Sequence, residues 1–504
     1  MSERSENKYL FRRQYIYGKN LTNDLSWKRV EARNDHSFLV HPDLEITEFF
    51  QDKNHFVLLG FILDPENATF SNTQILTHLA EISKDITSVA DFLEDKSGRF
   101  AIFCFLKNEE FVINDASGLR QVFYYQAVDG SICIASLPAL ISRKFGLQIS
   151  EEAKEYINSA RYQNKAEPWW PGVSTRYEDV IHLLPNHYLD LKKMVAYRFW
   201  PNKRIKRYTL RSGSELTGNL FRKILLSLHN RFPLAISMSA GFDSRVILAA
   251  CKDFQHEITT FSMIYRKLGE SSDDIVIPSE IARQLGLEHE IINCNNPPDE
   301  EFARIFTEST QDYKMDWLPI VQGRRDGIPA DKLILKGSVA EVGLCSYWPD
   351  GVYPFRVTLR FLVKKISLGE APLVYKYFRN WMMEALPSEK FGYKLLDLIS
   401  WENESGNWQG MSQAIFDLAH EEYSPFSNRK LLSIMLGINP KYRTYPDHKI
   451  ESEIIKHLWV ELSSFPCNPH KEDLSKKFYD GELLNKLRWL KYFFSRNKYD
   501  KLEE

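Results

Sequence analysis

Small and polar residues separate two apolar runs in the middle of the chain, at positions 239–244. The run before them, 234–238, predicts a buried strand, and the run after them, 246–250, predicts a helix. A tight turn there directs backbone N–H groups and the positive end of the helix at one point, where phosphate or pyrophosphate binds. Ser239 and Ser244 add hydroxyl donors, and Gly241 lets a ligand approach the backbone. Asp243 is a candidate ligand for Mg²⁺.

An ordinary strand–turn–helix joint with a capping serine is the alternative interpretation of this stretch. It lacks the Gly-Lys-Ser/Thr end of a Walker A loop. It resembles the S-G-G-x-D-S signature of the PP-loop ATP pyrophosphatases, which cleave ATP between the α- and β-phosphates. Ala240 stands in place of the first glycine. The resemblance implies that this loop receives the pyrophosphate part of ATP.

Composition sets the broad class of the protein. The chain has 504 residues, of which 43% are hydrophobic and 26% charged, with a net charge of −2. These values are typical of a folded globular protein of two or more domains and give no reason to expect nucleic-acid binding. The six cysteines are far apart, which favours reduced thiols in a cytoplasmic protein. The polar N-terminus is not typical of a secretory signal, and no apolar run approaches the roughly 18 residues of a transmembrane segment.

The pattern of apolar runs changes near residue 200. Before it, short runs separated by turn residues, such as 56–63, 100–106 and 132–136, predict an antiparallel, hairpin-rich domain. After it, strand-like runs at 258–263, 290–293 and 333–335 alternate with helical stretches, which predicts a parallel sheet. Beyond about residue 355 the pattern is mostly helical.

Several weak motifs occur in the order and spacing of one family, the class B asparagine synthetases. The segments that resemble its marks are 95–103, 115–125, 131–140, 184–189, 197–200, 260–263, 273–289 and 337–347. The resemblance implies an α/β and α+β protein of two domains. Residues 1–205 would form an Ntn-hydrolase-like antiparallel β-sandwich with helices. Residues 206–504 would form a PP-loop domain with a parallel α/β sheet and a helical C-terminal part.

Glutamine-using members of this family begin the first domain with a cysteine whose free α-amine serves as the base. Here the chain begins Met1-Ser2, and no cysteine precedes Cys104. We therefore expect a glutaminase-like domain without its nucleophile. In this respect the chain is most similar to the β-lactam synthetases and lasso-peptide cyclases.

The resemblance further implies an acyl-adenylate mechanism that uses ATP and Mg²⁺. A substrate carboxylate attacks the α-phosphate, pyrophosphate leaves, and an amine or ammonia then expels AMP from the acyl adenylate. The implied metal ligands are Asp243 and Glu341. The implied contacts to the nucleotide are Met238, Ser239, Ala240, Gly241, Asp243, Ser244, Met263, Lys336 and Gly337. Lys471 is the nearest candidate for a late catalytic lysine, and Arg245 for a further phosphate contact.

A binding or regulatory protein that has lost the chemistry is the alternative. Ser338 supports it, because it stands where relatives carry a proton-handling Glu or Tyr and has no suitable pKa for a general base. For the enzyme, we expect a small-molecule or peptide carboxylate and an amine donor as substrates. A homodimer and a complex with a biosynthetic partner protein both remain open.

Overall fold

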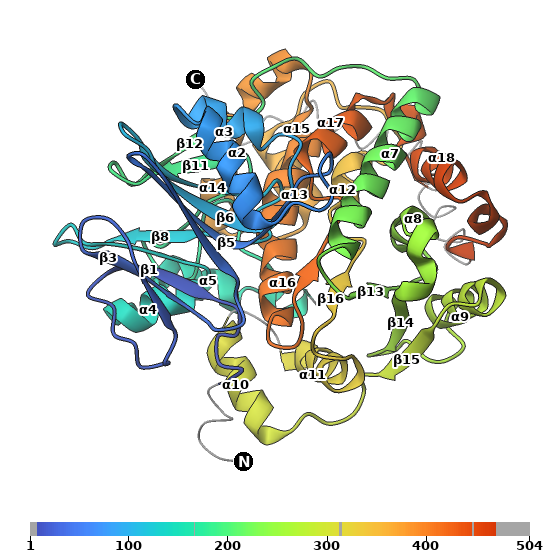
Figure 1. The fold of residues 1–504 in the computed structure, drawn as a ribbon, viewed down its shortest axis with the longest axis horizontal. Helices are drawn as coiled ribbons and strands as arrows, with labels where there is room; N and C mark the ends of the chain where they lie inside the picture. The colour runs from blue at the N-terminus through green and yellow to red at the C-terminus, as the bar shows by residue number, and fades with distance from the viewer. Residues whose placement is uncertain (1–7, 166, 312–314, 446–447, 470–504) are drawn as a thin grey trace.

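The computed structural model describes residues 8–165, 167–311, 315–445 and 448–469. Two antiparallel sheets are followed by a parallel sheet with helices, as Figure 1 shows. The predicted fold class is therefore confirmed. None of the described helices combines the length and apolar character that crossing a bilayer requires.

The two antiparallel sheets have six strands each and pack face to face. In the strand β5 (Asn54–Leu63), Val57 and Leu59 face the core between the sheets. Phe56 and Leu58 face the helices α2 (Asn72–Ile82) and α3 (Ile86–Phe92) on the other side. One sheet has the order β10 (Ile181–His182), β8 (Phe123–Gln126), β9 (Ile132–Ala135), β1 (Tyr15–Lys19), β3 (His36–Val40) and β2 (Lys28–Glu31). The other has the order β12 (Val195–Arg198), β11 (His187–Asp190), β7 (Glu110–Asn114), β6 (Ser97–Phe105), β5 (Asn54–Leu63) and β4 (Ile46–Gln51).

The third sheet has five parallel strands. Their order is β15 (His289–Asn293), β14 (Thr259–Ile264), β13 (Leu234–Ser237), β16 (Leu333–Leu335) and β17 (Glu422–Tyr423). The helix α7 (Leu210–His229) precedes β13. The connections from β13 to β16 contain α8 (Phe242–Ala250), α9 (Asp273–Leu285), α10 (Glu300–Thr310) and α11 (Leu318–Gly327). The two-residue strand β17 is the one strand among the described residues beyond 355, where the sequence predicts mostly helices.

The C-terminal part is otherwise helical and lies against both earlier parts of the chain (Figure 1). It contains α12 (Ala340–Gly343), α13 (Leu359–Ile366), α14 (Pro372–Ala385), α15 (Leu395–Ile399), the π-helical segment η4 (Ser400–Gln409), α16 (Gly410–Phe416), α17 (Arg429–Gly437) and α18 (Lys449–Leu458). The last sandwich strand ends at Arg198 and α7 begins at Leu210. The domain boundary that we predict after residue 205 falls in this connector.

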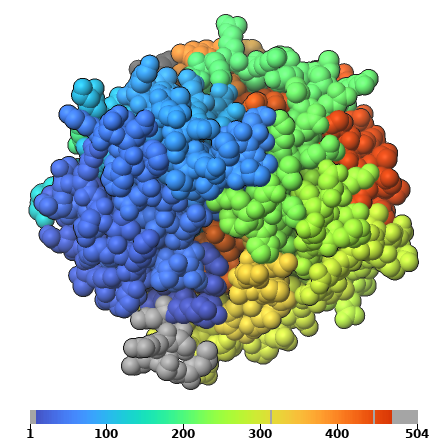
Figure 2. Space-filling view, viewed as in Figure 1, coloured from blue at the N-terminus to red at the C-terminus, as the bar shows by residue number. Residues whose placement is uncertain are grey.

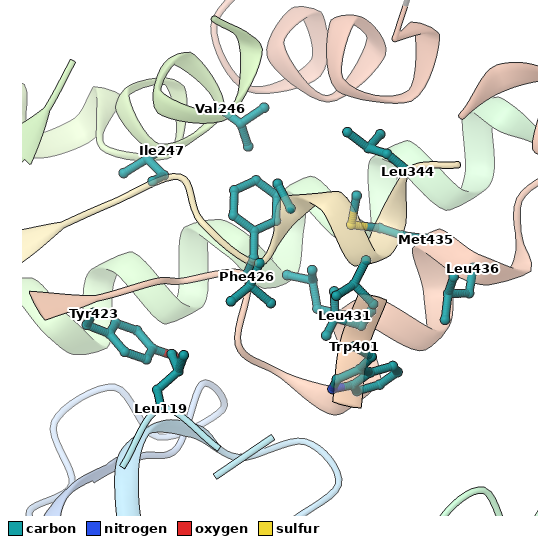
Figure 3. Close-up of a cluster of buried hydrophobic side chains, with 14 of the residues drawn as sticks. Leu119, Val246, Ile247, Leu344, Trp401, Tyr423, Phe426, Leu431, Met435 and Leu436 are labelled. Carbon is teal, nitrogen blue, oxygen red and sulfur yellow. The ribbon is translucent and has the colours of Figure 1, made fainter. Parts of the chain in front are cut away.

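The sandwich and the second half of the chain pack tightly on each other, as Figure 2 shows for one face. The largest apolar core joins Leu119 of the sandwich region to Trp401 and Tyr423 of the second half (Figure 3). Buried charges cross the same junction. The Arg99 guanidinium donates to both carboxylate oxygens of Asp417, at 2.6 and 2.8 Å.

Candidate nucleotide and metal site

The predicted phosphate loop joins the end of β13 to the start of α8, with Gly241 as the N-cap residue. The Ser239 and Ser244 hydroxyl oxygens lie 3.2 Å apart, and the Gly241 N–H donates to Ser239 Oγ over 3.2 Å. The Ala240 N–H donates to Asp274 Oδ1 over 2.9 Å. The loop therefore has the local geometry of an anion site, and a carboxylate oxygen already occupies one of its donors.

The other predicted nucleotide contacts lie at the ends of neighbouring strands. Met238 and Met263 lie at the ends of β13 and β14, and the Met238 N–H donates to Phe261 O over 2.8 Å. Lys336 and Gly337 follow β16 directly. Ligands bind beyond the carboxyl ends of parallel strands, so the structure places these residues at the expected edge. Their contact with adenosine stays a prediction.

Gly337 brings the end of β16 against the start of α8. A Cβ atom on Gly337 would lie 2.5 Å from Asp243 Cβ and 3.2 Å from the Ser244 backbone nitrogen. This close approach needs the absence of a side chain at position 337. It brings the segment that contains Glu341 next to the phosphate loop.

The carboxylates Asp243, Glu341 and Glu451 gather on this side of the loop. Burial, together with the charges of Asp243 and Glu404, raises the pKa of Glu341 to about 8. Burial also raises the pKa of Glu451, to about 7, with a contribution from Glu341. Acids this crowded need protons or a cation to balance their charge.

Glu451 is absent from the set of site residues predicted from the sequence. The available signal is its place in the sequence 449–458: Glu451, Ile454, Ile455 and Leu458 follow the spacing of one helical face, and all four are buried. An acid in such an apolar stripe points to a specific partner.

Tyr347 and Glu404 form a second ionisable pair near Glu341. The Tyr347 hydroxyl is hydrogen-bonded to the Glu404 carboxyl group, and burial raises the pKa of both. Glu404 also accepts a hydrogen bond from Ser400 Oγ at 2.9 Å. Both Ser400 and Glu404 belong to η4, and π-helical segments often occur at functional sites. Ser338 is buried, and its Oγ has no hydrogen-bond partner among the described residues.

Arg245 contacts the chain after α18. Its guanidinium donates to the carbonyl oxygens of Phe465 and Pro466, at 2.8 and 2.9 Å, and lies 2.7 Å from Cys467 Sγ. The next residue, Asn468, donates its N–H to Ala240 O in the phosphate loop over 3.1 Å. Through these contacts Arg245 holds residues 465–468 in place. A direct contact between Arg245 and phosphate stays a prediction. Lys471 lies outside the described residues.

The phosphate loop lies in a part of the chain that matches a known protein family. Residues 222–313, which include β13, the phosphate loop and α8, match the family model described as asparagine synthase. This part of the chain is therefore similar to the asparagine synthase family. The matched segment ends before Glu341 and Glu451, so their roles depend on the geometry alone. No curated protein matches the sequence significantly.

Three solved structures show limited similarity to this chain. The structure titled as the allosteric regulatory enzyme of purine biosynthesis is 12% identical, with a TM-score of 0.25 and coverage of 62% of this chain and 75% of its own. Glutamine phosphoribosylpyrophosphate amidotransferase from B. subtilis, complexed with ADP and GMP, is 12% identical, with a TM-score of 0.24 and coverage of 72% and 75%. Glutamine-dependent NAD⁺ synthetase from Acinetobacter baumannii, in complex with ADP, is 16% identical, with a TM-score of 0.17 and coverage of 48% and 49%. Because these TM-scores are low, nothing about this chain is inferred from them.

The match over residues 222–313 supports an ATP-dependent, amide-forming ligase as the broad class of this protein. Among the described residues, no three His, Cys, Asp or Glu side chains already surround a metal position. Mg²⁺ at phosphate sites needs fewer protein ligands, because one or two carboxylates, phosphate oxygens and waters complete its shell. The acids beside the loop fit that requirement.

Proposed function

We propose that this protein joins a carboxylic acid to an amine, activating the acid as an acyl adenylate with release of AMP and pyrophosphate. The observation that carries the proposal is the phosphate loop at the carboxyl edge of the parallel sheet, with buried acids on one side of it. Mg²⁺, when bound there, neutralises charge on the leaving pyrophosphate. The acid is a small molecule or a peptide, and the nucleophile is an amine or free ammonia.

The residues around the loop position the reactants and balance their charges. The Ser239 and Ser244 hydroxyls and the loop N–H groups donate hydrogen bonds to the pyrophosphate oxygens. For this, the Ala240 N–H must release its hydrogen bond to Asp274 and donate to phosphate instead. Asp243 holds the metal from the first turn of α8. The Tyr347–Glu404 pair is our candidate for taking the proton of the attacking amine, since Ser338 is unsuited to it.

The same proposal excludes glutaminase activity. The strand β1 begins at Tyr15, and residues 8–14 before it contain no Cys, Ser or Thr. This segment is held against the second half of the chain, with Arg12 Nη1 donating to Ala419 O at 2.7 Å and Arg13 Nη1 to Asp417 O at 2.7 Å. The thiols inside the sandwich are inert, because burial raises the pKa of Cys104 and raises that of Cys133 to about 12.

The experiment that tests the function uses ATP labelled in the α-phosphate and a panel of carboxylic acids, with and without amines. We expect AMP and pyrophosphate as products, and no release of glutamate from glutamine. Ser239→Ala removes one donor to the leaving group and should slow AMP formation by roughly 10–1000-fold. The side chain of Ser464 is exposed, and Ser464→Ala is the control.

Formation of ADP, or a rate unchanged by Ser239→Ala, would contradict the proposed mechanism. Binding of ATP without AMP formation for any acid would favour the second candidate, a nucleotide-binding regulatory protein. The observation that favours this candidate is the lack of a base at Ser338.

A further inference from the structure

Glu451 is buried beside the phosphate loop, and its environment leaves half of its carboxylate without a partner. The side chain is 0% exposed. Its Oε2 accepts a hydrogen bond from His448 Nδ1 over 2.8 Å, whereas Oε1 has no hydrogen-bond donor in the part of the chain that the structure describes. A buried carboxylate oxygen without a donor is costly, so Oε1 calls for a partner that the described residues do not supply.

The groups that face Glu451 are mostly acidic. The carboxyl group of Asp243 is within hydrogen-bonding contact of Glu451, Glu341 adds a further negative charge, and Cys467 is the nearby thiol. Two carboxylates in contact repel each other unless a proton or a cation lies between them. His448 balances Glu451 only from the Oε2 side.

The two helices that carry these acids are held in a fixed relation. The helix α18 packs along α8, and the rings of His448 and Phe242 are stacked with centroids 5.4 Å apart and planes 15° from parallel. Phe242 and Asp243 are adjacent in the first turn of α8. Glu451 therefore reaches the phosphate loop as part of the packed structure.

We propose that Glu451 binds the divalent cation of the reaction together with Asp243, so that a carboxylate pair from α18 and α8 holds it at the phosphate loop. This inference rests on the proposed function, because it assigns a further ligand at the same site. Phosphate oxygens and waters supply the other positions around a cation such as Mg²⁺. Glu341 contributes charge from α12. The competing explanation is that Asp243 and Glu451 share a proton in the working enzyme.

The variant Glu451→Gln separates the two explanations. An amide donates a hydrogen bond to Asp243 and accepts one from His448, so it preserves a proton-sharing contact and removes a charged cation ligand. The probe is Mn²⁺ with inorganic pyrophosphate, and free Mn²⁺ is counted by electron paramagnetic resonance. The control is Glu453→Gln on the same helix, where the carboxylate pairs with Lys456 at 2.7 Å on the surface.

We expect Glu451→Gln to weaken Mn²⁺ binding in the presence of pyrophosphate by roughly 10–100-fold, and Glu453→Gln to leave it unchanged. Without a cation, Glu451→Gln should melt at or above the temperature of the unmodified protein, because a buried repulsion is removed. With Mn²⁺ and pyrophosphate, its rise in melting temperature should be smaller. These opposite shifts would not follow from a simple packing defect.

Equal Mn²⁺ affinity in Glu451→Gln and the unmodified protein would overturn the inference and leave the proposed function standing. If the unmodified protein bound neither pyrophosphate nor Mn²⁺ with it, the inference and the phosphate-loop assignment would both fail. AMP formation, measured separately, tells these two results apart.

Discussion

His182 shows how burial at a single residue sets a pH dependence. It is 0% exposed, its Nδ1 lies 2.8 Å from Asn407 Oδ1, and its ring stacks on Phe123 at 4.6 Å. Burial lowers its pKa from 6.5 to about 4, against the effect of its hydrogen bond to Asn407 Oδ1, which raises the pKa. The folded protein therefore holds this ring neutral, whereas the unfolded chain protonates it below about pH 6.5.

The sign of the effect follows from this lowered pKa. Stability contributed by neutral His182 is present above pH 6.5 and is lost as the pH falls toward 4, by about 2 kcal/mol at pH 5. We expect His182→Gln to lose less stability than the unmodified protein between pH 7 and pH 5, by about that amount. Denaturant unfolding at the two pH values checks this, with exposed His256→Gln as the control. An identical loss in all three proteins would contradict it.

At the scale of elements, the close approach of β16 to α8 decides whether the phosphate loop is assembled. Gly337→Ala places a Cβ atom 2.5 Å from Asp243 Cβ, so the strand end and the helix must separate. We expect a loss of stability of about 1–3 kcal/mol and weaker pyrophosphate binding, measured by thermal melting and calorimetry. Gly269→Ala is the matched control, since a Cβ atom there meets nothing within 4 Å. Normal pyrophosphate binding by Gly337→Ala would show that this contact does not shape the site.

Elements differ in how far the sequence predicts them. The β13–loop–α8 unit is predictable because the apolar run, the small turn residues and the helical run are all local signals. The helix α9 begins at Asp273, where Ser272 caps it, and it continues through Pro278, a residue that usually limits a helix. The strand β17 has two residues, and each of them pairs with a residue of β16 that lies 88 positions earlier in the chain, so no local pattern reveals it. The place of Glu451 beside the loop likewise depends on the packing of α18 against α8, which no local pattern reveals.

At the scale of the whole molecule, buried ion pairs join the sandwich to the second half of the chain. Arg99 and Asp417 are 1% and 0% exposed. Removing one partner leaves a buried charge alone, so we expect Asp417→Ala to cost about 3–5 kcal/mol of stability. The double variant Arg99→Met with Asp417→Leu should recover part of this loss in denaturant unfolding.

The exposed pair Arg211–Glu215, 2.9 Å apart, provides the comparison, because Glu215→Ala should cost less than about 1 kcal/mol. A cost for Asp417→Ala as small as that of Glu215→Ala would mean that the junction does not depend on its charges.

The buried junction also means that the second half of the chain depends on the sandwich. Arg99 and Arg120 neutralise Asp417 and Glu421, and Arg198 neutralises Glu402, which is itself 0% exposed. A gene shortened to encode residues 206–504 alone would leave these acids in an apolar surface with no counter-charge. Losing the sandwich would therefore require several compensating mutations at once. The second half of the chain thus depends on the sandwich for the charges that balance its buried acids, whatever reaction the sandwich itself carries out.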